Sequence, residues 1–271
     1  HSSNPDDNLQ WHSSAETIAL FKRYGDWHQR LLPYFLQIVD DAVSLGLPPV
    51  RPIWWGAENA AELYDVEDQI LIGQDLLLAP IIEESSTQRT VVIPAGSTWR
   101  RWLDYEAHFG EVLTPGSHTL SADVDDTILL VRTGSVLPVL TQVYDTLALE
   151  RQGDDYAESL DPAPINITAI GLLMSVGGDG KGNFSHPDFG SIKWEIQSSA
   201  FDTATCDAVQ VNGNPLVGCA GDDSINCFAG NRIELRGELT SAQEVICASE
   251  SQSMTLNLEV SGLGKIFIEI R

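Results

Sequence analysis

Residues 68–80 read DQILIGQDLLLAP, an apolar run that begins after Asp68 and closes at Pro80. From Gln69 to Pro80 the run is too apolar for a surface strand, so we expect one buried strand. A second apolar run spans Val50 to Trp55, and an acidic stretch separates the two runs. Together with a helical segment upstream, they predict an α/β unit.

The helical segment begins near Ser13, because Ser13 and Glu16 have the spacing of a capping box. Apolar residues then recur with a helical period for about 25 residues. Pro33 is expected to bend this helix. Gly46 is expected to end it in a left-handed turn, since Pro48 follows closely.

The composition and the pattern of apolar residues change near residue 83. Short runs rich in β-formers alternate with Pro- and Gly-containing turns, at residues 90–93, 97–102, 118–121 and 127–132. This rhythm predicts an antiparallel β-sandwich. A Gly-, Asp- and Pro-rich join covers residues 151–164, and further β-type runs follow it. We therefore predict a multidomain chain of three units: α/β residues 1–82, a proximal β-sandwich at 83–150 and a distal β-sandwich-like unit at 151–271.

The charge balance limits the partners of this chain. Its 271 residues include 15 Lys and Arg against 39 Asp and Glu, a net charge of −24. Nucleic acid is not an expected partner, because that field repels a polyanion. No apolar run approaches the roughly 18 residues of a membrane span. The histidines and cysteines lack metal-site spacing and no loop has the EF-hand pattern, so we expect no metal and no cofactor.

The cysteines all lie late in the chain, at Cys206, Cys219, Cys227 and Cys247. An even number in a Gly-, Asn- and Asp-rich segment favours two disulfides and an oxidising compartment, so the predicted location is secreted or periplasmic. Cys206–Cys219 with Cys227–Cys247 is the most local pairing, but the spacing does not decide between pairings. Free buried thiols are the alternative.

Five short motifs resemble those of glycoside hydrolase family 31 α-glycosidases, in the family's order. They are RLLPY at residues 30–34, GLPPVRP at 46–52, the run at 68–80, IPAGSTW at 93–99 and VRTGSVLP at 131–138. The resemblance covers residues 1 to about 140. It implies that residues 1–82 are the end of a (β/α)8 barrel, followed by proximal and distal β-sandwiches. Residues 150–271 show no family pattern.

The resemblance also implies two substrate-binding residues. His1 matches a family histidine that contacts the sugar in the −1 subsite, although a terminal residue with no role is the alternative. With Pro5, Asn8 and Gln10 it resembles a pattern of certain α-glucosidases and of sulfoquinovosidases. The pair Trp54-Trp55 follows a strand whose end would face the active-site mouth, so one of the two, assigned as Trp54, could stack on a sugar. Packing between the barrel and the sandwich is the alternative for Trp54.

No catalytic pair of carboxylates is expected in this chain. A retaining glycosidase needs two carboxyl groups about 5–5.5 Å apart, and the family's nucleophile and acid/base motifs are both absent. Asp68 and Asp75 flank the buried run, where a cap or an internal ion pair is the better interpretation. Asp125 and Asp126 are expected to face water. Both catalytic aspartates would therefore lie upstream, and this chain alone is expected to be inactive.

The predicted function is that of a retaining α-glycosidase acting on α-linked sugars, by hydrolysis or transfer. Its expected partners are a carbohydrate substrate and a missing N-terminal barrel portion, either in the same protein or as a companion chain. A sulfoquinovosidase is one alternative. A non-catalytic carbohydrate-binding or surface module at residues 151–271 is another, resting on analogy of fold alone.

Overall fold

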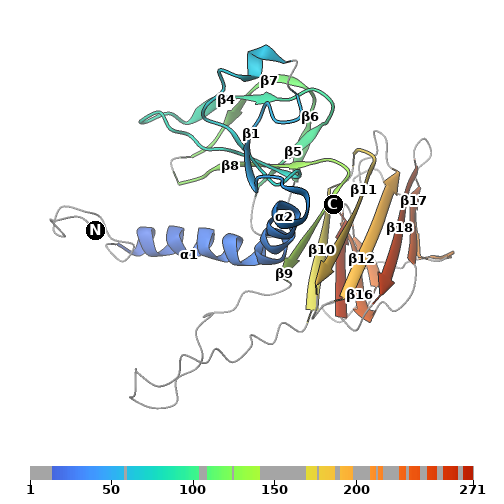
Figure 1. Cartoon of the computed structure of the whole chain (residues 1–271). Coiled ribbons are helices and arrows are strands. Elements are labelled where there is room, and N and C mark those ends of the chain that lie inside the picture. The colour runs from blue at the N-terminus through green and yellow to red at the C-terminus, as the bar shows by residue number, and fades with distance from the viewer. Residues whose placement is uncertain are drawn as a thin grey trace, which may run out of the picture.

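The computed structural model describes residues 14–57, 60–103, 109–123, 125–140, 169–175, 177–186, 190–197, 208–211, 213–215, 226–229, 232–238, 243–248, 253–261 and 265–270. Two helices lie beside two groups of strands (Figure 1). We call strands β1 to β8 the first β unit and strands β9 to β19 the second β unit. No helix in these ranges has the length and apolarity needed to cross a membrane.

The first helix, α1 (Ala15–Arg30), is capped one residue later than the sequence predicts. Ser14 is the N-cap, and its side-chain oxygen accepts a hydrogen bond from the Thr17 N–H at 3.0 Å. Glu16 is therefore at the second helical position, and the predicted capping box with Ser13 is wrong. Its carboxylate still lies in the first turn, where it favours the helix dipole.

The predicted single bent helix is two helices. Leu31 ends α1 and begins α2 (Leu32–Leu45), with Pro33 in the first turn of α2. Proline fits there because the first-turn N–H groups have no partner inside the helix. Gly46, with φ of 70°, ends α2 as predicted.

The first β unit consists of an antiparallel sheet covered by a hairpin. The sheet runs in the order β1 (Val50–Pro52), β2 (Ile70–Ile72), β3 (Leu76–Ala79), β8 (Ile128–Arg132), β5 (Trp99–Trp102) and β6 (Phe109–Leu113). The covering pair is β4 (Gln88–Ile93) and β7 (Gly116–Ser121). Four of these strands, β4, β5, β7 and β8, fall on the four predicted runs.

The run from Gln69 to Pro80 is a hairpin, so the single strand predicted there is wrong. β2 and β3 pair antiparallel on either side of a turn that contains Gly73, whose φ is 64°. A Cβ at Gly73 would overlap the Tyr34 hydroxyl and lie 2.6 Å from an Ile38 methyl carbon. The turn therefore fits against α2 only with glycine, and the α/β interpretation gives way to antiparallel strands.

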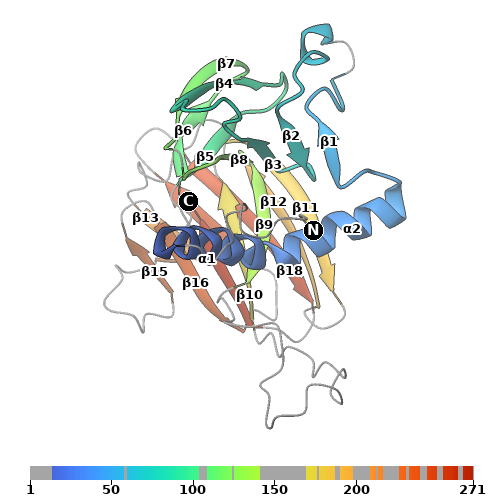
Figure 2. The ribbon, with the colours of Figure 1, turned by 90° about the vertical axis from the view of Figure 1, so that its left-hand side faces the viewer.

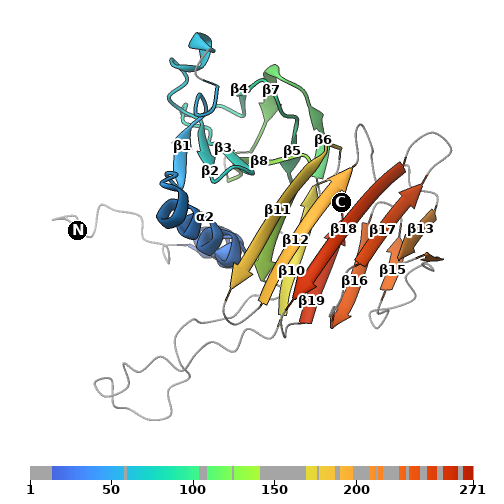
Figure 3. The same cartoon turned by 45° about the vertical axis from the view of Figure 1, so that its right-hand side comes forward.

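The second β unit has two facing sheets (Figure 3). One runs in the order β15 (Asn226–Ala229), β16 (Arg232–Glu238), β19 (Lys265–Ile270), β10 (Ala169–Ser175) and β9 (Ser135–Leu140), with β10 and β19 parallel. The other runs in the order β11 (Gly180–His186), β12 (Gly190–Gln197), β18 (Ser253–Ser261), β17 (Gln243–Ala248), β13 (Ala208–Val211) and β14 (Asn214–Pro215). Because β9 pairs with β10, one sheet takes strands from both sides of residues 151–164. The domain boundaries themselves stay a prediction.

The two helices pack in the corner between the β units (Figures 1 and 2). One core cluster joins side chains of α1, α2, β3, β5, β8, β9 and β10: Trp27, Leu31, Tyr34, Ile38, Leu76, Trp102, Leu129, Val131, Leu137, Val139 and Leu173. A second cluster lies between the first sheet and its covering hairpin. Strands β3 and β8 contribute side chains to both clusters and are therefore buried on both faces, and this explains their nearly continuous apolar sequences.

A tight turn carries the chain from one β unit to the other. Thr133 and Gly134 connect β8 to β9, and the Gly134 N–H donates to the Ser175 carbonyl at 2.7 Å. Gly134 has φ of 76° and lies directly against Gly178 of the β10–β11 turn and Gly180 at the start of β11. We call this contact the glycine seam. It brings two backbones together without intervening side chains.

Candidate functional site

Most of the predicted site residues have side chains outside the described part of the chain. His1, Cys206 and Cys219 lie outside the described residues. Cys227 is in β15, and Cys247 is in β17 opposite Val209. The side chains of these two cysteines are also outside the description, so both disulfides and their pairing stay predictions.

Trp54 is half-buried beside two more exposed aromatic rings. It contacts the core beneath the first sheet and lies 6.3 Å from the Trp55 ring and 5.5 Å from the Tyr64 ring, between centroids. Trp55 is 38% exposed and Tyr64 is 46% exposed. Sequence reasoning singled out Trp54 and missed Tyr64, which follows the short 3₁₀ helix Ala61–Leu63. We call Trp54, Trp55 and Tyr64 the aromatic cluster.

Successive turns hold the aromatic cluster. Backbone N–H groups donate to carbonyls three residues earlier, from Trp55 to Pro52 at 3.0 Å and from Ala57 to Trp54 at 2.9 Å. The same pattern returns at Leu63, Tyr64 and Val66, at 3.0 to 3.2 Å. Beneath them Ile53 is 1% exposed and Leu63 is 3% exposed. Hydrogen-bonded turns anchored by buried residues give the rings a fixed position.

The acids that flank the Gln69–Pro80 run are structural, as predicted. Asp68 forms an ion pair with Arg89 at 2.7 Å. Asp75 forms one with Arg132, whose Nε and Nη2 lie 2.9 and 2.6 Å from Asp75 Oδ1. Burial raises the pKa of the Asp75 carboxyl, while Arg132 acts in the opposite direction. Both acids therefore hold strands together.

Tyr34 connects α2 to the same hairpin. Its hydroxyl donates to the Ile72 carbonyl at 2.8 Å and accepts from the Asp75 N–H at 3.2 Å. Burial, with the Asp75 charge, raises the pKa of Tyr34. The hydroxyl therefore stays protonated and serves as a fixed link between helix and turn.

Asp125 and Asp126 differ, although both were expected to face water. Asp125 is exposed, as expected. Asp126 instead forms ion pairs with Arg101 at 2.9 Å and with Arg23 of α1 at 3.5 Å. Asp126 therefore links α1 to the first sheet, and its carboxylate is engaged by two arginine side chains.

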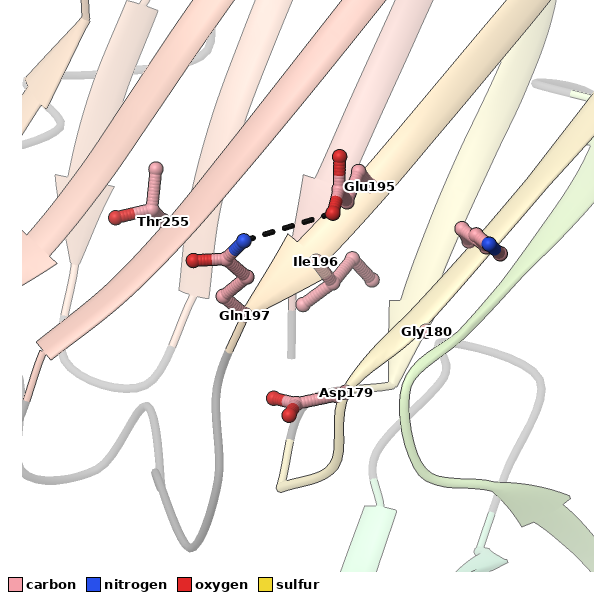
Figure 4. A pocket seen from close by; sticks show the side chains of 7 residues that line it. Asp179, Gly180, Glu195, Ile196, Gln197 and Thr255 are labelled. Atoms are coloured by element: carbon pink, nitrogen blue, oxygen red, sulfur yellow. Dashed lines mark hydrogen bonds between the residues drawn. The ribbon is translucent and has the colours of Figure 1, made fainter.

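An open polar pocket of about 560 Å³ lies on the second β unit (Figure 4). Its lining comes from β11, β12, β18 and the β10–β11 turn, and includes Asp179, Lys181, Glu195, Gln197 and Thr255. Gln197 Nε2 donates to Glu195 Oε1 at 3.5 Å. In the parts of the chain that the structure describes, no three His, Cys, Asp or Glu side chains gather as metal ligands would.

The β-rich fold and the motifs are similar to those of the C-terminal domain of glycosyl hydrolases. Residues 46–137 match the family described as glycosyl hydrolase family 31 C-terminal domain. This match over residues 46–137 agrees with the resemblance seen in the motifs of the chain.

Two curated relatives share part of this sequence, and one solved structure shares its fold. Sulfoquinovosidase of Escherichia coli strain K12 is 33% identical over 120 residues, 44% of this chain and 17% of that protein. Alpha-glucosidase 2 of Bacillus thermoamyloliquefaciens is 29% identical over 128 residues, 47% of this chain and 16% of that protein. The family 31 dextranase of Flavobacterium johnsoniae, complexed with glucose, has a TM-score of 0.66 at 14% identity over 96% of this chain and 34% of its own. The chain thus spans 16–17% of these two curated relatives.

Proposed function

We propose that this chain is the C-terminal part of a retaining α-glycosidase that acts on α-linked sugars. The observation that carries the proposal is the family 31 match over residues 46–137. The nucleophile and the acid/base are aspartates in a preceding segment of the same protein or of a companion chain. In the described residues Asp68, Asp75 and Asp126 are all engaged in ion pairs, which supports an upstream catalytic pair.

The helices supply a surface for that preceding segment. Ile18 of α1 is 44% exposed, while Val39 and Val43 of α2 are 49% and 83% exposed. Val39 and Val43 are four residues apart and so share one face of α2. Large exposed apolar patches are uncommon on soluble proteins that act alone. We place α1 and α2 at the end of a (β/α)8 barrel, with this face against the earlier barrel elements.

Two forms of the protein test the proposal. One is the 271-residue chain, and the other adds the segment encoded immediately before His1. Aryl α-glucosides should be hydrolysed only by the longer form, with the α-anomer of the sugar as the first product by NMR. Turnover by the 271-residue chain alone would refute the upstream catalytic pair. A longer form without glycosidase activity on any α-linked sugar would refute the proposed function.

A sulfoquinovosidase is the second candidate. It is favoured by the 33% identity to the Escherichia coli sulfoquinovosidase and by the pattern that begins at His1. The longer form should be compared on aryl α-glucoside and aryl α-sulfoquinovoside. A higher kcat/KM on the sulfonated substrate would select this candidate over a neutral-sugar glycosidase.

We also propose that the protein is secreted or periplasmic. The proposal rests on the four clustered cysteines, which suit two disulfides in an oxidising compartment. Unfolding the protein without reductant and adding a maleimide should label none of them. Labelling of all four would indicate free thiols and a reducing compartment.

A further inference from the structure

The aromatic cluster is placed where a ligand could reach it. It lies in the segment between β1 and β2, which projects from the first β unit on the side away from the second (Figures 1 and 2). Trp55 and Tyr64 are exposed by 38% and 46%, whereas Trp54, whose ring lies near both, is half-buried. The exposed rings of Trp55 and Tyr64, next to half-buried Trp54, form an apolar surface that is anchored to the core through Trp54.

Backbone hydrogen bonds and buried residues hold the segment that carries these rings. The turns at residues 52–57 and 60–66 are closed by backbone hydrogen bonds of 2.9 to 3.2 Å, and buried Ile53 and Leu63 fix these residues to the core. A site that is already ordered loses little conformational entropy on binding. This favours a small rigid ligand that binds a ring face directly.

The charges around the rings narrow the chemistry of that ligand. Glu62, Asp65 and Glu67 are exposed in the same segment. The sequence has no Lys or Arg from residue 52 to residue 88. Carboxylates accept hydrogen bonds from hydroxyl groups, but they repel anions. The surroundings therefore suit a neutral polyhydroxyl compound and disfavour a sulfonated or phosphorylated one.

We propose that Trp55 and Tyr64 bind a neutral pyranose unit of an α-linked oligosaccharide. The apolar face of the sugar ring stacks on the indole or the phenol ring, and hydroxyls at its edge donate to the neighbouring carboxylates. The inference rests on the proposed glycosidase function and deepens it. It names a specificity-determining contact away from the bond that is cleaved, and it favours a neutral sugar over sulfoquinovose.

Binding to the 271-residue chain tests the contact without catalysis. Maltotetraose, isomaltotetraose and methyl α-sulfoquinovoside are titrated and followed by saturation-transfer NMR. One of the two neutral sugars should bind, and the sulfonated glycoside should bind at least tenfold more weakly, about 1.4 kcal/mol. Trp55→Ala and Tyr64→Ala should each weaken neutral-sugar binding by roughly tenfold. Trp55→Phe keeps an aromatic face and should stay within about threefold.

Phe21→Ala is the matched control, because Phe21 is an aromatic residue of α1 that is 62% exposed. It should leave binding unchanged. Absence of binding by the wild type, wild-type affinity in both alanine variants, or equal binding of the sulfonated glycoside would overturn the inference. Circular dichroism checks that each variant is folded, and Trp55→Phe separates a lost contact from a lost fold.

The longer form separates this inference from the proposed function. If that form hydrolyses aryl α-glucoside and Trp55→Ala leaves its KM for the tetrasaccharide unchanged, the stacking contact is wrong while the glycosidase stands. If sugar binding depends on Trp55 but the longer form hydrolyses no α-linked sugar, the stacking contact stands and the proposed glycosidase function is wrong. Protection of Trp55 from oxidation in the sugar-free longer form would show that preceding residues cover the ring, and would also overturn the inference.

Discussion

Replacing Gly180 with alanine tests the glycine seam. A Cβ at this position overlaps the carbonyl oxygen of Gly134 and lies 2.7 Å from its carbonyl carbon. Ordinary contact begins near 3.4 Å, so clearing the carbonyl carbon alone requires a separation of about 0.7 Å, and clearing the nearer oxygen requires more. Both obstructing atoms belong to the backbone, and no side chain can rotate away.

The cost follows from two losses. Overpacking of this kind costs about 1–3 kcal/mol, and breaking the hydrogen bond from the Gly134 N–H to Ser175 adds about 1 kcal/mol. We therefore expect Gly180→Ala to lower the free energy of unfolding by about 2–4 kcal/mol. For a chain of this size each kcal/mol corresponds to roughly 2–4 °C, so the melting temperature should fall by about 4–16 °C.

Thermal and urea unfolding followed by circular dichroism give both quantities. Gly110→Ala is the matched control, because a Cβ there meets its nearest atom, Arg101 Cβ, at an ordinary 3.6 Å. That variant should unfold at or slightly above the wild-type temperature. A melting temperature for Gly180→Ala within about 1 °C of wild type would refute the backbone contact at the seam.

Three further outcomes are expected. Gly25→Ala in α1 has nothing within 4 Å of the added methyl and should raise the free energy of unfolding by about 0.5–1 kcal/mol, whereas a loss in urea unfolding would contradict an exposed helical site. Trp102→Ala should cost about 3–5 kcal/mol, since Trp102 is 2% exposed and lies 5.8 Å from the Trp27 ring; a cost under about 1 kcal/mol would place it outside the core. Burial raises the pKa of Asp75 above 3.8, so the folded protein binds this proton more tightly than the unfolded chain does. Stability from Asp75 is then greatest at low pH and falls as pH rises through the folded pKa. Asp75→Asn should remove that fall from the pH profile of urea unfolding, and an unchanged profile would contradict the buried carboxyl.

Local signals in the sequence predicted much of the first β unit. The four β-rich runs correspond to β4, β5, β7 and β8, because apolar residues and turn residues alternate within a few positions of one another. Gly46 ends α2 for an equally local reason, its left-handed backbone. These features need no information from elsewhere in the chain.

Features set by distant contacts could not be predicted in this way. The turn at Gly73 splits an apolar run into β2 and β3, and the residue that shapes it, Tyr34, is 38 positions from Ile72, which accepts its hydrogen bond. Strand β9 pairs with β10 across a long intervening segment, so the sequence near residue 135 carries no sign of its partner.

The candidate site also contains features that the local sequence predicts and features that it does not. The sequence identified a tryptophan pair, but no period applies inside consecutive turns, so it could not rank their exposure. Tyr64 joins Trp54 through folding of the segment between them, at 5.5 Å. The ion pair of Asp75 could be expected from its position beside a buried run, although its partner Arg132 could not.

The position of β19 has a consequence for biosynthesis. This strand, Lys265–Ile270, follows the other described strands in sequence, yet it lies between β16 and β10 inside its sheet. While the ribosome still holds those residues, β16 and β10 have no common neighbour, and their facing edges stay open to other chains. A premature stop codon before Lys265 would leave the same gap permanently, and the product would be a substrate for chaperones and proteases.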